Sequence, residues 1–275
     1  MFLLKKFIRH FIKKFIPYKI ILLARRFFYF IRSIFYKGSS FHCPICSFDA
    51  SNFIDGGEDT KVNREKNIVG AGHFLNNFCP NCNSGYKERF FFLNLSNFLN
   101  QNSNLSILHI APENSFSFLS SNIFLSHKYI TADLSMRHVD LNLNLNHIPF
   151  DDNSFDVVIA NHVFEHIDTD VNAMCEVFRV LKPNGKLFAQ VPFSPLLDIC
   201  FEGSDPYKLS NIQREALYGQ YDHVRIYSLP CYLDRLISAG FTVSTYLPCD
   251  LYNLDIIHKY CLNDNEIFFD ISKSS

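Results

Sequence analysis

Four cysteines form two C-x-x-C pairs in the first third of the chain, and their spacing predicts metal chemistry. The first pair is Cys43 and Cys46 in the sequence HCPIC, and the second is Cys79 and Cys82 in CPNC. Two such pairs can complete a tetrahedral zinc site, with Zn–S distances of about 2.3 Å and no open position. We therefore expect a structural zinc in a zinc-ribbon-like module. The 32 residues between the pairs exceed the usual ribbon spacing, so four unrelated thiols in a loop remain the alternative.

A second cluster of polar residues lies at 221–227, in the sequence YDHVRIY. His223 and Arg225 are our candidate substrate contacts there, because a guanidinium can bind a carboxylate or phosphate through two parallel hydrogen bonds. The alternative is a salt-bridged entry to the helix that follows.

The elements that would position such residues alternate between strand and helix from residue 104 onward. Short apolar runs predict strands, and apolar residues at helical spacing predict helices between them. Lys182-Pro183-Asn184-Gly185 is expected to end the central helix. The order predicts an α/β fold with a mostly parallel sheet that binds its ligand at the carboxyl ends of the strands. The expected strands are 105–111, 128–132, 139–143, 155–160, 186–191, 241–247 and 266–271, and the expected helices are 115–124, 170–181 and 229–239.

Residues 107–195 resemble the class I S-adenosylmethionine (SAM) dependent methyltransferases, within the small-metabolite, type 11-like branch. The resemblance rests on ITADLS (130–135), IPFDDNSFDVVIANHVFEH (148–166) and CEVFRVLKPNGKLFAQVPF (175–193). It implies a Rossmann-like, seven-stranded sheet whose last strand is antiparallel, and SAM as cofactor. The two C-x-x-C pairs and GQYDHVRIY (219–227) are similar to one subgroup with a zinc-ribbon-like front. No G-x-G-x-x-G follows the first expected strand, which argues against an NAD enzyme.

The resemblance also implies a cofactor site. Asp133 takes the place of the acid that accepts both ribose hydroxyls, with a helix N-cap as its alternative role, and Leu134 follows it. The position that contacts adenine falls near Asn144, although Asp140 is the nearest acid. Asn161 completes the expected site.

The first turn departs from the family pattern, which places an acid and then glycines after the first strand. Here the turn reads LHIAPEN, so His109 replaces the acid, and Ala111 and Glu113 replace two glycines. Two interpretations stay open: Glu113 contacts the α-ammonium of SAM, or the cofactor site is degraded.

Methyl transfer needs an oriented acceptor and, for a hydroxyl acceptor, a base. The resemblance places His162 and His166 at the edge of the sheet that faces the methyl group. His162 is our candidate base, whereas Glu165-His166 more often anchors the following helix in this family.

Charge divides the chain into two unequal parts. Residues 1–37 carry six Lys and four Arg with no acid, a charge of +10, which leaves −11 for the remainder of a chain whose net charge is −1. The acidic body argues against a nucleic-acid substrate. In residues 1–37, charges interrupt every apolar window long enough to span a bilayer, and no signal-peptide cleavage site follows. One face of the expected helix is apolar, with Leu4, Phe7, Ile8, Phe11 and Phe15.

We therefore expect a basic amphipathic arm at 1–37, a zinc-ribbon-like module at 38–90 and a methyltransferase domain at 91–275. The arm would bind an anionic membrane surface, or else pack on the acidic body. An odd cysteine count indicates reduced thiols and a cytoplasmic protein. The expected activity is methyl transfer from SAM to a small-molecule, sugar or lipid-linked glycan acceptor. A methyltransferase-fold scaffold that has lost SAM binding is the alternative.

Overall fold

The computed structural model describes residues 18–118, 123–135, 138–203, 205 and 208–274. Its central feature is a seven-stranded sheet with the order β13-β14-β9-β8-β5-β6-β7. β14 pairs antiparallel with both of its neighbours, and the other pairings are parallel. The predicted Rossmann-like sheet with an antiparallel last strand is therefore confirmed. The strands are β5 (Ser106–Ile110), β6 (Lys128–Asp133), β7 (Leu141–Asn142), β8 (Phe155–Ile159), β9 (Leu181–Phe188), β13 (Thr242–Tyr246) and β14 (Phe268–Ser272).

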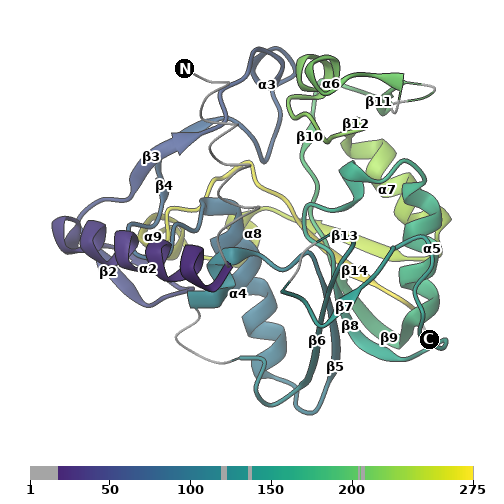
Figure 1. Cartoon of the computed structure of the whole chain (residues 1–275), viewed down its shortest axis with the longest axis horizontal. Helices are drawn as coiled ribbons and strands as arrows, with labels where there is room; N and C mark the ends of the chain where they lie inside the picture. Colours follow the sequence, from purple (N-terminus) through teal and green to yellow (C-terminus); the bar gives the residue numbers. More distant parts are fainter. Residues whose placement is uncertain (1–17, 119–122, 136–137, 204, 206–207, 275) are drawn as a thin grey trace.

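Helices cover both faces of this sheet, as Figure 1 shows. Helices α5 (Asp170–Val180) and α7 (Leu229–Ser238) lie on one face, and α4 (Tyr86–Asn100) lies on the other. Successive side chains of a strand point to opposite faces, so one strand contributes to two cores. Leu108 and Val158 belong to the core beneath α5, whereas Ile107 and Val157 belong to the core beneath α4. The buried apolar runs that predicted these strands are explained by this covering on both sides.

Three expected elements differ from the structure. The helix expected at 115–124 is described as a short 3₁₀ turn, η1 (Asn114–Phe118), and residues 119–122 lie outside the described part. The strand expected at 139–143 shrinks to the two residues of β7. The central helix ends at Val180, and Leu181 already begins β9, so the expected turn at 182–185 is an irregularity within that strand. Asn184 there has a φ of 64°.

The N-terminal part contains α2 (Tyr18–Phe35), two antiparallel strand pairs and a short helix. β1 (Lys37–Cys43) pairs with β2 (Phe48–Ala50), and β3 (Ile54–Gly57) pairs with β4 (His73–Phe78), with α3 (Lys61–Glu65) between the latter two. The boundary expected between residues 90 and 91 lies inside α4, because this helix packs against both the cysteine turns and the sheet. The apolar face expected at residues 4–15 lies outside the described residues.

A small three-stranded sheet stands beside the carboxyl edge of the main sheet. It consists of β10 (Phe193–Ser194), β12 (Arg225–Ser228) and β11 (Phe201–Glu202), in that order, with α6 (Asn211–Tyr218) nearby (Figure 1). The polar cluster at 221–227 therefore runs from a loop into a strand. The long connection before β14 holds α8 (Pro248–Leu251) and α9 (Leu254–Lys259).

Candidate active site and metal centres

The two C-x-x-C pairs meet in space. The Sγ atoms of Cys43 and Cys82 lie 3.6 Å apart, and those of Cys46 and Cys79 lie 3.7 Å apart. All four sulfur atoms lie within 4.8 Å of one another. Four thiols at this separation are the donor set of a closed, tetrahedral zinc site, so the residues present fit a structural zinc.

Matching turns present the two pairs. The amide of Ser47 donates to the carbonyl of Cys43, and the amide of Asn83 donates to the carbonyl of Cys79. Both Ser47 and Asn83 have a positive φ, of 55° and 63°. Each pair thus lies on a tight knuckle of the same geometry. Arg32 of α2 donates to the carbonyls of Cys79 and Pro80, which fixes the helix against the second knuckle.

The turn after β5 is held together by Glu113. Its carboxylate accepts from the ring of His109 at 3.0 Å and from the amide of Asn161 at 2.8 Å. Burial opposes ionisation, but these two hydrogen bonds keep the pKa of Glu113 below its usual value. In the neutral tautomer whose Nε2–H donates to that carboxylate, Nδ1 of His109 accepts from the hydroxyl of Tyr129 at 2.8 Å. The predicted cofactor residues His109, Glu113 and Asn161 therefore form one network at the edge of the sheet.

Ala111 adopts the backbone conformation that a glycine would normally supply. Its φ is 51°, in the left-handed region that costs an alanine about 1–2 kcal/mol. Its amide still donates to the carbonyl of Ala132 at 2.8 Å. The turn thus has a positive φ at Ala111, a position where the family pattern has a glycine.

Sequence reasoning missed a second acid beside this turn, Glu88 at the start of α4. Ser115 donates to one carboxylate oxygen of Glu88, and the amide of Gly85 donates to the other. Burial raises the pKa of Glu88, and the nearby charge of Glu113 raises it further. The spacing of Glu88 from the motif residues gave no signal, because α4 precedes the expected sheet.

The residues expected to hold adenosine follow β6. Asp133 ends that strand, and one of its carboxylate oxygens accepts from the amide of Ser135 at 2.6 Å. Leu134 exposes 65% of its surface beside it. The carboxylate of Asp140 binds the amide and hydroxyl of Thr131, whereas Asn144 accepts from the amide of Asn146 in an exposed turn. The contacts of Asp140 stabilise the edge of the sheet, and the adenine assignment stays a prediction.

A cavity of about 130 Å³ lies at the end of β8. His162 lines this cavity, and its backbone φ is 54°. Its ring Nδ1 lies 3.4 Å from the carboxylate of Glu165. The ring Nε2 is buried and has no hydrogen-bond partner among the described residues. Burial and the charge of Lys87 lower the pKa of His162, so its ring is neutral at neutral pH. A neutral imidazole with a free nitrogen can accept a proton.

Glu165, His166 and His223 line the same cavity. The rings of His166 and His223 meet edge to face, with centroids 4.7 Å apart. Burial lowers the pKa of His223 to about 4. Burial alone would raise the pKa of Glu165, but His162, His166 and His223 together hold it at about 2. The cavity therefore contains a buried carboxylate among three imidazoles.

Arg225 of β12 is a buried cation that contacts the loop after β8. It is 3% exposed, and its guanidinium donates to the carbonyls of Phe164, Ile167 and Asp168 and to the carboxylate of Glu202. These contacts hold the loop after β8 in place, as the alternative interpretation of a salt-bridged role expects. Arg225 also lines the cavity at the end of β8, so its assignment as a substrate contact stays a prediction.

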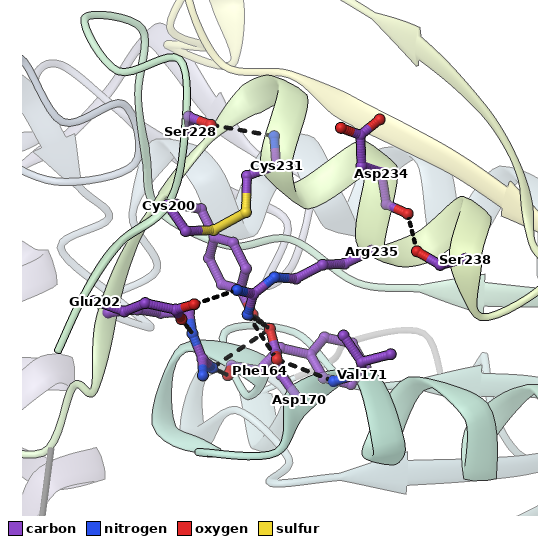
Figure 2. The surroundings of a disulfide bond; sticks show 12 residues. Phe164, Asp170, Val171, Cys200, Glu202, Ser228, Cys231, Asp234, Arg235 and Ser238 are labelled. Carbon is purple, nitrogen blue, oxygen red and sulfur yellow. Dashed lines mark hydrogen bonds and ion pairs between the residues drawn. A yellow bond between two sulfur atoms is a disulfide. The ribbon is translucent and has the colours of Figure 1, made fainter. Parts of the chain in front are cut away.

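Figure 2 shows the part of this network that surrounds the disulfide beside α7. Arg235 reaches both Glu202 and Asp170, at 2.5 Å and 2.7 Å, next to a disulfide between Cys200 and Cys231. This disulfide contradicts our expectation that all thiols are reduced. The loop before β11 and the start of α7 bring the two Cα atoms to 5.7 Å, within the range that a disulfide spans. Their separation of 31 residues gave no signal for the pairing.

The N-terminal part supplies one wall of the cavity, which sequence reasoning also missed. Val69 forms a backbone bridge with Phe193 of β10, and Ser194 donates to the carbonyl of Lys66. Gly70, and Lys87 at the start of α4, line the same cavity as His162. The ammonium of Lys87 donates to the carbonyl of Gly70 at 3.1 Å.

Comparison with known proteins finds a family match within the part of the chain that forms the main sheet. Residues 111–189 match the family described as "Methyltransferase domain". The chain is also similar to the uncharacterized protein MJ0638 of Methanocaldococcus jannaschii, with 34% identity over 77 residues that cover 22% of this chain and 34% of that protein. It spans about a third of the length of that relative.

Two solved structures show the same kind of similarity at low identity. The YcgJ protein of Bacillus subtilis is 14% identical, with a TM-score of 0.43, over 68% of this chain and 99% of that chain. An S-adenosylmethionine-dependent methyltransferase of Mesorhizobium loti is 13% identical, with a TM-score of 0.41, over 66% of this chain and 96% of that chain. The order of the seven strands is that of a Rossmann-like sheet, and residues 111–189 within it match the methyltransferase domain family.

Proposed function

We propose that this chain transfers a methyl group from SAM to a hydroxyl of a small-molecule, sugar or lipid-linked glycan acceptor. The observation that carries the proposal is His162, a buried neutral imidazole whose Nε2 has no partner among the described residues and which lines the cavity at the end of β8. A carboxyl acceptor is already ionised at neutral pH and would need no base, so the unpartnered imidazole favours a hydroxyl.

The cofactor residues are proposed from the network around the first turn. Asp133 would accept the ribose hydroxyls, since it ends β6 at the carboxyl edge of the sheet. Leu134 would cover the adenine ring, and Asn144 or Asp140 would bind its edge. Glu113 and Glu88 bring two carboxylates together beside the turn, an arrangement that suits the α-ammonium of SAM. His109 and Asn161 would hold Glu113 in position, and Ala111 would shape the turn.

The chemical step is an in-line displacement. The acceptor oxygen forms a bond to the methyl carbon, the carbon–sulfur bond breaks, and its electron pair stays on sulfur. The hydroxyl proton passes to Nε2 of His162. Glu165, near Nδ1 of the same ring, stabilises the imidazolium that forms.

Calorimetric titration of the full chain with S-adenosylhomocysteine tests the cofactor site. We expect binding of micromolar order in the wild type, at least tenfold weaker binding in Asp133→Ala, and no binding of NAD. Asp151→Ala, at an exposed acid outside the site, is the matched control and should bind as the wild type does. Equal affinity in Asp133→Ala and the wild type would remove Asp133 from the site.

A scaffold that has lost SAM binding is the second candidate. The observation in its favour is that both carboxylate oxygens of Glu113 already have protein partners. Absence of S-adenosylhomocysteine binding in the wild type, with a cooperative unfolding transition, would favour the scaffold over the enzyme.

The four cysteines would bind one structural zinc. The convergence of their sulfur atoms supports this proposal, and the module they join is small enough to need such a constraint. Zinc analysis of the purified chain should find this metal at the cysteine site.

We propose that the protein lies in the cytoplasm, peripheral to the inner face of the membrane. The disulfide between Cys200 and Cys231 removes the argument from reduced thiols, so the proposal rests on the basic, apolar N-terminal segment alone. In the part of the chain that the structure describes, no helix has both the length and the apolar character needed for a membrane span. Helix α2 exposes several large apolar side chains. It also contains Arg25 and Arg26, which are among the basic residues of the segment 1–37. Such a helix fits an anionic membrane surface. The exposed apolar residues are Ile20, Leu23, Phe27, Phe28, Phe30, Ile31, Ile34 and Phe35.

Flotation with vesicles that contain anionic lipid tests this placement. We expect the full chain to float with them, and Phe27→Ser/Phe30→Ser to float several-fold less. Leu125→Ser, an exposed apolar residue outside α2, is the control. Equal partitioning of all three proteins would leave the arm packed on the protein or on a partner.

A further inference from the structure

Three potential metal ligands meet at the cavity at the end of β8, which we call the acceptor cavity, away from the cysteine site. Glu165 and His166 belong to the 3₁₀ turn η2 (Phe164–His166) after β8, and His223 belongs to the loop before β12. One ligand atom from each of the three lies within 4.8 Å of the others. Two segments that are distant in sequence thus bring together two imidazoles and one carboxylate.

The carboxylate of Glu165 is buried and incompletely satisfied. The residue is 1% exposed, and its Oε2 has no hydrogen-bond partner among the described residues. The guanidinium of Arg225, which is close by, donates to Glu202 and to backbone carbonyls. A buried carboxylate oxygen without a partner costs free energy, so its presence points to a ligand that the protein binds there.

The ring of His166 is oriented by a hydrogen bond typical of metal ligands. Its Nδ1 lies 3.2 Å from the backbone carbonyl of Asp222, and a carbonyl can only accept, so Nδ1 carries the proton. Nε2 then keeps its lone pair. Metal-binding histidines usually donate their other ring N–H to a carbonyl or carboxylate in this way.

We propose that Glu165, His166 and His223 bind a divalent transition-metal cation, such as Zn²⁺ or Mn²⁺, at the acceptor cavity. Two histidines and one carboxylate are a common ligand set for such cations, and they leave coordination positions open. Those positions would take oxygen atoms of the acceptor, because the three ligands line the cavity that also contains His162.

The role that we assign to this cation is to bind and activate the acceptor, and this role rests on the proposed methyltransferase function. A cation with open positions selects acceptors that chelate, such as a sugar with two neighbouring hydroxyls or a hydroxy acid. Coordination lowers the pKa of the bound hydroxyl, which makes its proton easier for His162 to accept. The methyl group then bonds to that oxygen, and the sulfur keeps the electron pair of the broken bond.

Metal titration of the full, zinc-loaded chain tests the site without any need for activity. Binding of Mn²⁺ is followed by the loss of the free-ion electron paramagnetic resonance signal, and binding of additional Zn²⁺ by competition with a chromophoric chelator. Mn²⁺ prefers nitrogen and oxygen to thiolate, so the cysteine site does not compete for it. We expect one such cation per chain.

His223→Ala and Glu165→Gln should each weaken this binding at least tenfold. His147→Ala, which removes a histidine outside the cluster, should bind as the wild type does. Glu165→Gln keeps the side-chain size, so it remains informative if the smaller side chain in His223→Ala impairs folding. Absence of both cations from this site in the wild type, or unchanged binding in Glu165→Gln, would overturn the proposal.

Titration with S-adenosylhomocysteine separates the two proposals. Cofactor binding without cation binding would overturn the metal site and leave the methyltransferase function in place. Cation binding without cofactor binding would support the metal site and remove the proposed use of it.

Discussion

The guanidinium of Arg225 and the carboxylate of Asp170 lie 3.4 Å apart, and each side chain is 3% exposed. Asp170 also binds Arg235 at 2.7 Å and accepts from the hydroxyl of Tyr227. One buried acid at the start of α5 therefore connects β12 and α7 to the loop after β8.

Replacement of Asp170 by Asn should lower the free energy of unfolding by about 3 kcal/mol. The buried Arg225 and the partly buried Arg235 would then share Glu202 as their remaining acid. Chemical denaturation measures this change. Asp152→Asn, which removes an exposed partner of Arg179, is the control and should change stability by less than about 0.5 kcal/mol. A similar small change in both variants would contradict the role of Asp170.

Cys43→Ser should lose the zinc and destabilise the N-terminal part of the chain. The sulfur of Cys43 is buried within the four-thiol cluster, and three thiolates hold the metal much less tightly. Metal analysis and thermal unfolding check both effects. Cys175→Ser changes an exposed free thiol outside the cluster, so it should keep the wild-type zinc content. Full zinc occupancy in Cys43→Ser would refute the four-cysteine site.

Ala111→Gly should stabilise the protein by about 1 kcal/mol, because glycine adopts the φ of 51° without the cost that alanine bears. Ala132→Gly, in the regular strand β6, should do the opposite and destabilise by a similar amount. Denaturant midpoints of the two variants and the wild type give the comparison. A loss of stability in both would show that Ala111 is not strained.

Glu266 predicts a pH dependence of stability that a single variant can remove. Burial raises its pKa to about 7, against an ordinary value of 4.5, and its Oε2 has no partner among the described residues. Below pH 4.5 the acid is protonated in both states. Between pH 4.5 and 7 the unfolded chain ionises while the folded chain holds its proton, so stability falls as pH rises, by about 3 kcal/mol in total.

Glu266→Gln should therefore match the wild type near pH 4.5 and become progressively more stable than the wild type up to pH 8. Unfolding curves at several pH values measure the difference. Glu65→Gln, which makes the same substitution at an exposed acid on α3, is the control. A constant difference between Glu266→Gln and the wild type would contradict the raised pKa.

The sequence predicted most of the central sheet, because strands buried on both faces are continuous apolar runs such as FDVVI. It predicted the cysteine site for a different reason, since knuckles that offer two thiols need a fixed local spacing. Short edge elements such as β7 were predicted less well, because their two residues are held by pairing with β6 and not by any local pattern.

The parts of the site that sequence reasoning missed depend on tertiary contacts. Glu88 and Lys87 come before the expected sheet, and they reach the site because α4 packs across its face. The sequence assigned Arg225 to the substrate because a guanidinium can bind an anion, and it could not show that Arg225 also donates to backbone carbonyls of the loop after β8. The Cys200–Cys231 pairing likewise follows from the fold and from no spacing rule.

The bridge between Val69 and Phe193 lies on a segment anchored between the two cysteine knuckles. If the four cysteines bind zinc as proposed, a chain without zinc would also lose the order of this segment, and one wall of the cavity with it. The proposed activity would then depend on the supply of a metal that lies outside the cavity.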